Sequence, residues 1–473
     1  MQTKEKDINS MLSIVTGSIA NLELWKKHQI DTIVNAANPT LMGSNQGVDY
    51  EIHTLFDSYF RTDYEREIEL GHTPFFEKTL NENICKELNT TNAPSFIRCK
   101  RGEAVTTTGY GKCNNIIHVV GAKYDGNTNN LCNPKASDYC TSSCINTLES
   151  CYINIIEEAK KHSDIKGIGI PIIGSGAYHV PFDLATKIAI ASIGNALLDW
   201  KTQDQEAFEY AGIERIVFFI FNEAKKKQEK QFELSQQILN KYNEHFSKNQ
   251  KVVFQTSKEA HYRYLREIKL NDAQRGYFSI AKNIRYRLMA IRWFFLPILC
   301  LKDILGKENW HKRREIVEWI VFTKTLLPLI FSFLLQWDCF LNLSLYLTVP
   351  GQLKYWMSGL ILYFLLDTIT YLILLIIMSD IQRPSANIIR SIIMLFINYI
   401  EVECDIAFLY SICYRTNFLE SLKFSFLGIE SENMIAPLLE FIFHFGNVGT
   451  KFFFTTLVFS YFFSHIRQRK FRS

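Results

Sequence analysis

Residues 167–186 read GIGIPIIGSGAYHVPFDLAT, and this stretch decides the fold of the amino-terminal half of the chain. Its first seven residues form an unbroken apolar run, which predicts a strand buried on both faces. A turn of small residues at 174–176 follows the strand and lets the backbone approach a ligand closely. A helical pattern then begins near Leu184.

Residues 31–53 repeat this arrangement. A strand-like run at 31–34 leads into VNAANPTLMGSNQGVDYEIH at 34–53. A buried strand, a turn and a helix together present free backbone N–H groups to a phosphate. For a single loop of this kind, a plain strand-to-helix connection is the better interpretation. Further runs predict a mixed α/β sheet, with strands at 116–120 and 216–221 and helices at 142–161 and 184–200.

The two loops resemble those of the macrodomain family, whose members are three-layer α/β/α modules that bind ADP-ribose and related nucleotides. Four motifs occur in the family's order: NAAN at 35–38, GVDxxIH at 47–53, GEAVTTTGYG at 102–111 and IPIIGSGAY at 170–178. The resemblance covers roughly residues 11–246. It implies the α/β fold class for this half of the chain.

The resemblance also implies which residues bind the nucleotide. Asn35 and Asn38 occupy the positions that engage the terminal ribose, and the backbone of 174–178 occupies the position that holds the diphosphate. Asp49 occupies the acidic position that helps to activate water in hydrolytic members, so it is catalytic only if this chain is a hydrolase. The expected ligand-binding residues are Ser18, Ile19, Asn35, Ala36, Asn38, Gly47, Val48, Asp49, Gly174, Ser175, Gly176, Ala177 and Tyr178.

Two positions depart from the family's pattern. Ser18 stands where the family commonly has an acid that reads the adenine amino group, and a hydroxyl accepts that hydrogen bond without charge-assisted strength. The sequence GSNQG at 43–47 replaces the glycine run at the distal ribose. We expect its bulkier side chains to reshape the pocket for a modified or enlarged ADP-ribose. Residues 55–98 exceed a minimal member and are expected to form a lid or a protomer contact.

The chain has 11 cysteines, which in a cytosolic setting indicate reduced thiols rather than disulfides. Cys140, Cys144 and Cys151 share one face of an expected helix, with Cys132 nearby, so a metal site is one interpretation. No CxxC pair is present, so buried small apolar side chains are the better interpretation. We expect no metal and no cofactor.

The charge is unevenly distributed along the 473 residues. Of the 52 basic and 48 acidic residues, only 16 lie in the 141 residues from 325 to 465. The mean hydropathy of −0.03 therefore averages two chemically different halves. The net charge of +4 gives no support to nucleic-acid binding, which requires clustered basic surface.

The carboxyl-terminal half predicts an all-α transmembrane helical bundle of four spans, at 317–337, 355–378, 388–413 and 435–463. The basic residues flanking these spans place both termini in the cytoplasm, and Lys324 is counted among those that precede or begin the first span. The beginning of the sequence is polar and shows no signal peptide. We therefore expect a multi-pass protein of the inner (plasma) membrane with a cytoplasmic macrodomain.

The expected domains are a macrodomain at 1–250, a linker at 251–316 and the transmembrane part at 317–473. Within the linker, residues 288–301 are too short to span and predict an interfacial helix, with a fifth crossing as the alternative. The last two spans and the amphipathic segment at 418–426 weakly resemble two-helix pore-loop channels. The potassium selectivity-filter sequence is missing.

Charged residues inside the expected spans indicate more than an inert anchor, since each costs about 2.5–3.5 kcal/mol at bilayer depth. Glu401 and Asp405 are four residues apart and share a helix face. Two interpretations stay open. In the first, the acids pair with each other or with Lys451, or lie at interfacial depth because the span boundaries differ by a few residues. In the second, they face a water-filled path. The full set is Asp367, Glu401, Asp405, Glu440 and Lys451.

Two functions compete. In the first, the macrodomain binds an NAD-derived nucleotide, ADP-ribose or a conjugate, and gates a membrane pore in a homo-oligomer. This architecture resembles Thoeris-type antiphage effectors, in which a TIR-domain enzyme supplies the signal. In the second, the chain is a membrane-anchored ADP-ribosyl hydrolase with Asp49 activating water. The altered glycine run and the charged residues in the spans favour the first.

Overall fold

The computed structural model describes residues 6–122, 144–262, 264–265, 268, 282–341, 351–378, 388–429 and 437–458. The chain divides into two compact units, and each is described by itself. The sheet unit lies within Met1–Thr256, Lys269–Tyr277 and Glu308–His311. The helical unit lies within Ser257–Ile268, Phe278–Lys307 and Lys312–Ser473.

The sheet unit contains one six-stranded sheet in the order β1-β6-β5-β2-β4-β3. The strands are β1 (Leu12–Thr16), β2 (Thr32–Ala37), β3 (Ala104–Thr108), β4 (Asn115–Val120), β5 (Gly167–Pro171) and β6 (Arg215–Ile220). All neighbouring pairs are parallel except β3 with β4. β5 is apolar and fully buried, as expected for a strand with both faces covered.

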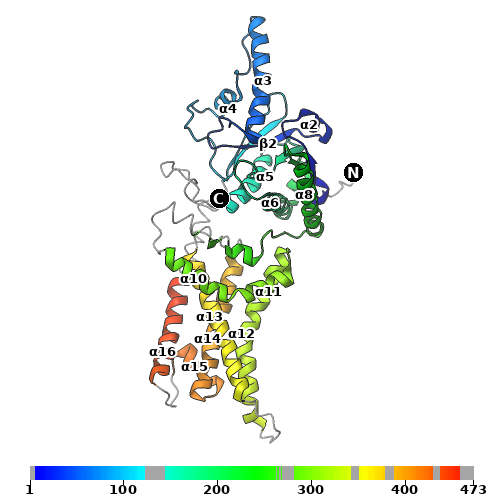
Figure 1. Ribbon diagram of the computed structural model, residues 1–473. Helices are drawn as coiled ribbons and strands as arrows, with labels where there is room; N and C mark the ends of the chain where they lie inside the picture. The colour runs from blue at the N-terminus through cyan, green and yellow to red at the C-terminus, as the bar shows by residue number, and fades with distance from the viewer. Residues whose placement is uncertain are drawn as a thin grey trace. The chain divides into compact units, whose positions relative to one another are not determined.

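Helices cover both faces of this sheet, which confirms the expected three-layer α/β/α arrangement (Figure 1). Successive strand residues point to opposite faces, so Val34 packs into one core cluster and Ile33 into the other. The first cluster includes residues of α1 (Ile8–Met11), α5 (Cys144–Ala159), α6 (Phe182–Gln203), α7 (Gln205–Tyr210) and α8 (Lys225–Phe246). The second includes residues of α2 (Leu22–His28), α3 (Gly47–Glu69) and α4 (Leu80–Glu87).

The extra sequence at 55–98 forms the rest of α3 and the whole of α4. A capping box begins α4: the Thr79 hydroxyl accepts from the Glu82 amide, and the Glu82 carboxylate accepts from the Thr79 amide. The Leu80 amide also donates to Asp57 of α3 at 2.7 Å. Beyond α3 the side chain of Phe75 is 81% exposed. A lid or protomer contact for this segment stays a prediction.

The helical unit is built almost entirely of long helices. They are α10 (Lys282–Phe294), α11 (Leu296–Gly306), α12 (Trp310–Leu341, which begins in the sheet unit), α13 (Gly351–Ile377), α14 (Ile388–Tyr414), α15 (Phe418–Leu427) and α16 (Pro437–Phe452), which continues as a π-helical turn at Phe453–Val458. Within the described residues, two segments are long and apolar enough to cross a bilayer, Trp310–Leu335 and Leu353–Ile377. These two segments give a membrane bundle weak support only, and the four spans stay a prediction.

Two expectations for this unit are corrected. The single interfacial helix expected at 288–301 is broken at Phe295 into α10 and α11, where Pro297 stands in the first turn of α11. Lys324, expected among the flanking cations of the first span, lies well inside α12 with its side chain buried.

Candidate functional site

The site predicted from the sequence lies where β2 and β5 end side by side in the sheet. From β2 the chain moves to β3 and β4 on one side, and from β5 it moves to β6 on the other. Open α/β sheets place ligand crevices outside the carboxyl ends of strands at such a switch point. The loop at 38–46 follows β2 and the loop at 172–181 follows β5, so the topology brings both expected loops to the same edge.

The loop after β5 has a backbone shaped for close approach. Gly174 has φ +84°, and a Cβ there would lie 2.8 Å from Val180. The Val180 amide donates to the Gly174 carbonyl at 2.9 Å and closes the turn. In the described part of the chain, the exposed amides of Gly176 and Ala177 donate to no protein acceptor. These two amides are free to bind an anion.

Tyr178 and Ser175 both hold this loop in place by contacts with neighbouring residues. The ring of Tyr178 packs over Gly121, since a Cβ on that glycine would lie 3.3 Å from the ring. The Ser175 hydroxyl donates to the Ile172 carbonyl at 2.8 Å, so it serves the turn itself. Beneath the loop, the Ile173 amide donates to the buried Tyr152 hydroxyl at 2.8 Å. Only the tip of the loop therefore presents free donors.

The loop after β2 is held by Asn38. Its amide nitrogen donates to the Gly43 carbonyl at 2.5 Å, and its amide oxygen accepts from the Thr40 amide and hydroxyl at 3.1 and 2.7 Å. The structure thus uses both ends of this side chain to shape the loop, and contact with a ribose stays a prediction. Next, α3 begins at Gly47 after Gln46, whose side chain makes no cap hydrogen bond. The first amides of α3 thus lie uncapped at this edge.

Asp49 lies in a buried polar cluster rather than on an open wall. Asn35 donates to Asp49 Oδ1 at 2.8 Å, and His53 Nε2 lies 3.4 Å from the same oxygen. His118 contacts Asn35 at 3.3 Å and the Thr107 hydroxyl at 2.9 Å. Burial lowers the pKa of His118 to about 3, with the neighbouring His53 acting in the same direction and Asp49 against it.

Burial in this cluster restricts the access of water to Asp49, which a catalytic base requires. The residue is 3% exposed, and its second oxygen has no hydrogen-bond partner among the described residues. An unpaired buried acceptor is costly and is a candidate for an interaction with an incoming group. The sequence reasoning missed His53, His118 and Thr107; the motif GVDxxIH contained His53, but nothing local indicated that β4 places His118 opposite Asn35.

Ser18, which the sequence predicts to lie near the adenine, contacts an acidic side chain. Its hydroxyl donates to the Glu51 carboxylate of α3 and accepts from the Ala20 amide at 3.1 Å. Ile19 beside it is buried, and its carbonyl accepts from the Trp25 indole at 2.6 Å. Ser18 stands where the family commonly has an acid. In this structure the carboxylate next to Ser18 comes from Glu51 of α3 instead. Sequence reasoning missed Glu51, because the contact joins residues 33 positions apart.

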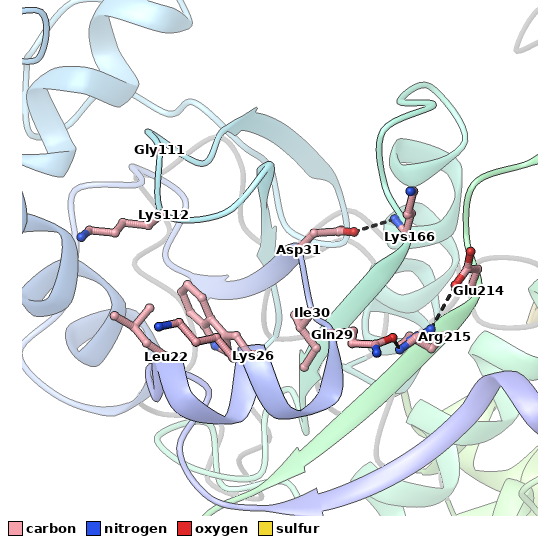
Figure 2. Close-up of a pocket in the computed structure, with 11 residues that line it drawn as sticks. Leu22, Lys26, Gln29, Ile30, Asp31, Gly111, Lys112, Lys166, Glu214 and Arg215 are labelled. Carbon is pink, nitrogen blue, oxygen red and sulfur yellow. Dashed lines mark hydrogen bonds and ion pairs between the residues drawn. The ribbon is translucent and has the colours of Figure 1, made fainter.

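A separate hollow of about 470 Å³ lies at the opposite edge of the sheet, beside the residues that precede β2, β5 and β6 (Figure 2). Asp31 there accepts from the Lys166 and Gly167 amides at 3.0 and 3.2 Å, and burial raises the pKa of its carboxyl. Arg215 is bound to Gln29 and Glu214. Because its lining groups largely bind one another, we assign no ligand to this hollow.

The helical unit holds a second buried polar cluster. The Lys324 ammonium on α12 lies 3.1 Å from Asp367 and 2.5 Å from the Thr368 hydroxyl on α13, and 2.9 Å from Glu401 on α14. Of the alternatives left open by the sequence, pairing of Glu401 with Lys451 is wrong, because Lys324 on α12 binds Glu401. Asp405 is buried next to this cluster, whereas Glu440 is exposed and Lys451 is half-buried.

Within the described residues, no group of three or more His, Cys, Asp or Glu side chains could hold a metal ion. Cys151 is buried in the first core cluster beneath β4 and donates to the Val120 carbonyl at 3.3 Å. Cys132, Cys140 and the side chain of Cys144 lie outside the described residues. Of these four cysteines, the structure describes only the side chain of Cys151, and it is buried.

A parallel α/β sheet with two anion-compatible loops at one switch point defines a small-molecule binding module. Comparison with known proteins identifies its family: residues 75–189 match the family model described as Macro domain. A macro domain-containing protein of Mesorhizobium japonicum is 30% identical over 183 residues, which cover 38% of this chain and 76% of that protein. The chain belongs to the macro domain family.

Two further similarities differ in extent. The mouse ADP-ribose glycohydrolase MACROD1 is 26% identical over 221 residues, 46% of this chain, and the match spans only 50% of the mouse protein. A solved macrodomain of Oceanobacillus iheyensis with ADP is 23% identical, with 51% of this chain and 96% of that chain covered and a TM-score of 0.30. The family-model match at residues 75–189 lies within the sheet unit.

Proposed function

We propose that the sheet unit binds ADP-ribose or a conjugate of it and that the helical unit responds as a membrane effector. The observation that carries the proposal is the pair of free amides at Gly176 and Ala177, which face the same edge as the uncapped start of α3. Both features suit a diphosphate. The similarity to a mouse protein named ADP-ribose glycohydrolase supports this class of ligand.

In this proposal the terminal ribose lies near Asn35 and Asn38, with the diphosphate over the tip of the β5 loop and Tyr178 beside it. Ala36 and Val48 contribute from the ends of β2 and α3. The residues at 43–47 leave a differently shaped distal pocket than a glycine run would, which suits an enlarged ADP-ribose. Residues 1–250 would form this receptor, 251–316 the linker and 317–473 the membrane part.

The helical unit would be the output. Ligand binding shifts a two-state equilibrium only through different affinity for the two states. The buried charges around Lys324 support a bundle with a function beyond anchoring, because an inert anchor avoids such residues. We propose a pore in a homo-oligomer at the inner membrane, in antiviral defence, with a TIR-domain enzyme as the source of the signal.

The alternative function is hydrolysis of ADP-ribosyl groups, and the unpaired oxygen of Asp49 favours it. Against it, Asp49 is nearly fully buried and already accepts from Asn35. A base that takes a proton from water must reach that water within hydrogen-bond distance. Sensing is therefore the better-supported proposal.

Calorimetry with ADP-ribose on the full chain in lipid nanodiscs tests ligand binding. Gly176 has open space around a Cβ and an ordinary φ, so both Gly176→Glu and Gly176→Gln are compatible with the loop. We expect Gly176→Glu to abolish binding by charge repulsion and the matched Gly176→Gln to retain it. Equal binding by both variants would contradict placement of the diphosphate at this loop.

Two further measurements separate sensing from hydrolysis. Incubation with an ADP-ribosylated protein should leave the modification in place; steady release of ADP-ribose that Asp49→Asn removes would establish the hydrolase instead. In liposomes, ADP-ribose or a conjugate should induce dye release by the wild type and not by Gly176→Glu. Release that is independent of nucleotide would contradict the coupling of the two units.

A further inference from the structure

The buried cluster of the helical unit contains more acceptors than donors. Lys324 has three N–H donors, and three acceptors use them: Asp367, Thr368 and Glu401. The Thr368 hydroxyl in turn donates to Glu401 at 2.6 Å. Every donor of this group is therefore engaged, and no donor of Lys324 remains for another carboxylate.

Asp405 is the carboxylate left over. It is 0% exposed, and neither of its oxygens has a hydrogen-bond partner among the described residues. The second oxygen of Glu401, one turn earlier on α14, is also unpartnered. Asp367 and Glu401 thus contact the one ammonium, and Asp405 is a third buried carboxylate close enough to feel its charge. A buried ion without a partner costs several kcal/mol, so the surplus negative charge must be neutralised.

A backbone acceptor that lacks its usual helical partner lies at the level of Asp405. Lys324 contacts Glu401, and seven residues further along each helix the rings of Phe331 and Phe408 lie 6.1 Å apart. The two helices therefore run in the same direction in register, which places Asp405 level with Pro328. Because proline has no N–H, Pro328 leaves the carbonyl of Lys324 without its usual hydrogen bond within α12.

We propose that Asp405 is a proton-binding site and that, in the folded state described here, it is a neutral carboxylic acid. A proton on Asp405 would remove one negative charge. It would also give the carboxyl group an O–H donor for one of the neighbouring acceptors. A metal ion fits less well, because no described group of three or more ligating side chains surrounds the site. The proposal does not depend on which nucleotide the sheet unit binds.

Other titratable groups in this part of the helical unit affect the titration of Asp405. They are Lys324 on α12, Asp367 and the Tyr363 phenol on α13, and Glu401, Glu403 and Cys404 on α14, with Lys451 on α16 on the side of Glu403. Glu403 has its own donor, the Ser425 hydroxyl, which also donates to the Glu403 carbonyl at 2.7 Å. Asp405 is therefore the acid of this region without any donor.

Infrared spectroscopy of the full chain in nanodiscs tests the proposal, because a neutral carboxylic acid has a carbonyl-stretch band that a carboxylate lacks. At neutral pH we expect this band in the wild type and its loss in Asp405→Asn, whose amide resembles the neutral acid in shape and supplies a donor. Glu440→Gln, at an exposed acid of α16, is the matched control and should keep the band. An Asp405→Asn spectrum that keeps the full band would overturn the proposal.

The pH dependence of thermal unfolding is the second measurement. The folded state would hold a proton that an exposed Asp, with an ordinary pKa of about 3.9, has lost by neutral pH. Stability therefore falls as pH rises above about 3.9, with the folding equilibrium shifting by about tenfold per pH unit, and it levels off once folded Asp405 has released its proton. Asp405→Asn should lack this fall, and Glu440→Gln should show it. If Asp405→Asn does not fold, the carbonyl-stretch band of the wild type tests the proposal by itself. The band must then disappear reversibly at alkaline pH, and a band that persists there would contradict the proposal.

Discussion

Ser18, in the loop after β1, donates its hydroxyl to the carboxylate of Glu51 on α3. The first loop thus lacks an acid of its own but contacts one supplied by the helix that begins the second loop. This relationship changes what the substitution at residue 18 means for the ligand. The sequence indicates a weaker adenine contact, whereas the structure places a carboxylate beside Ser18.

Glu51→Gln tests whether that carboxylate reads the nucleotide base. Hydrogen bonds to charged groups contribute about 1.5–3 kcal/mol against about 0.5–1.5 for neutral ones, so we expect roughly tenfold weaker binding of ADP-ribose. Calorimetry on the full chain measures this. Glu65→Gln, at an exposed acid further along α3, is the control and should bind normally. Unchanged affinity in Glu51→Gln would mean that the carboxylate only positions Ser18.

Gly174→Ala tests the backbone of the β5 loop. A Cβ at this residue meets Val180 at 2.8 Å and the residue has φ +84°, so we expect a loss of stability of about 1–3 kcal/mol. Gly176→Ala, two residues on, has nothing within 4 Å of its Cβ and should be neutral. Hydrogen exchange of the amides in β5 measures both. Equal protection in the two variants would contradict the strained turn.

The sequence predicted the elements that depend on local pattern. The apolar run at 167–173, the turn at 174–176 and the helix pattern after it are all local, and the structure has β5, the turn and α6 there. The contacts that define the candidate site are not local. Glu51 reaches Ser18, and β4 brings His118 to Asn35, only because the sheet order places distant segments together. No spacing in the chain encodes these pairs.

In the helical unit, too, the sequence does not show which charged residues pair with one another. The sequence predicts that Lys324 is a flanking cation, because it lies near the start of an apolar stretch. The helix in fact begins at Trp310, so Lys324 lies deep in α12, where Asp367 and Glu401 bind it. Hydropathy indicates which segments are apolar, but the pairing of charges within them depends on which helices are neighbours.

His118 gives a pH dependence to the sheet unit. Its pKa falls from 6.5 to about 3 on folding, so the unfolded chain binds a proton in this range that the folded chain excludes. The associated stability is fully present above pH 6.5 and is lost progressively as pH falls toward 3, by about 1.4 kcal/mol per pH unit. Hydrogen exchange of β4 at several pH values measures this loss.

His118→Gln should be less stable at neutral pH, because Thr107 and Asn35 lose a partner, but should show a smaller loss on acidification. His72→Gln, at an exposed histidine beyond α3, serves as the control and should keep the wild-type dependence. A pH profile of His118→Gln that parallels the wild type would show that another group titrates.

Lys324→Met removes the one cation of the buried cluster. It leaves Asp367 and Glu401 without their partner, and removal of one member of a buried ion pair costs about 3–5 kcal/mol. We therefore expect a marked fall in the thermal unfolding temperature of the full chain in nanodiscs. Lys354→Met, at an exposed lysine in the first turns of α13, should leave it unchanged.

Neutralising the two acids as well separates charge from packing. In the triple variant Lys324→Met, Asp367→Asn, Glu401→Gln no uncompensated ion remains, so most of the lost stability should return even though the hydrogen bonds to the ammonium do not. If the triple variant is no more stable than Lys324→Met, the contribution of Lys324 is packing of its side chain against neighbours such as Phe364, whose ring lies 5.6 Å from the ammonium. Recovery would instead show that the ion network, and not shape alone, joins α12 to α13 and α14.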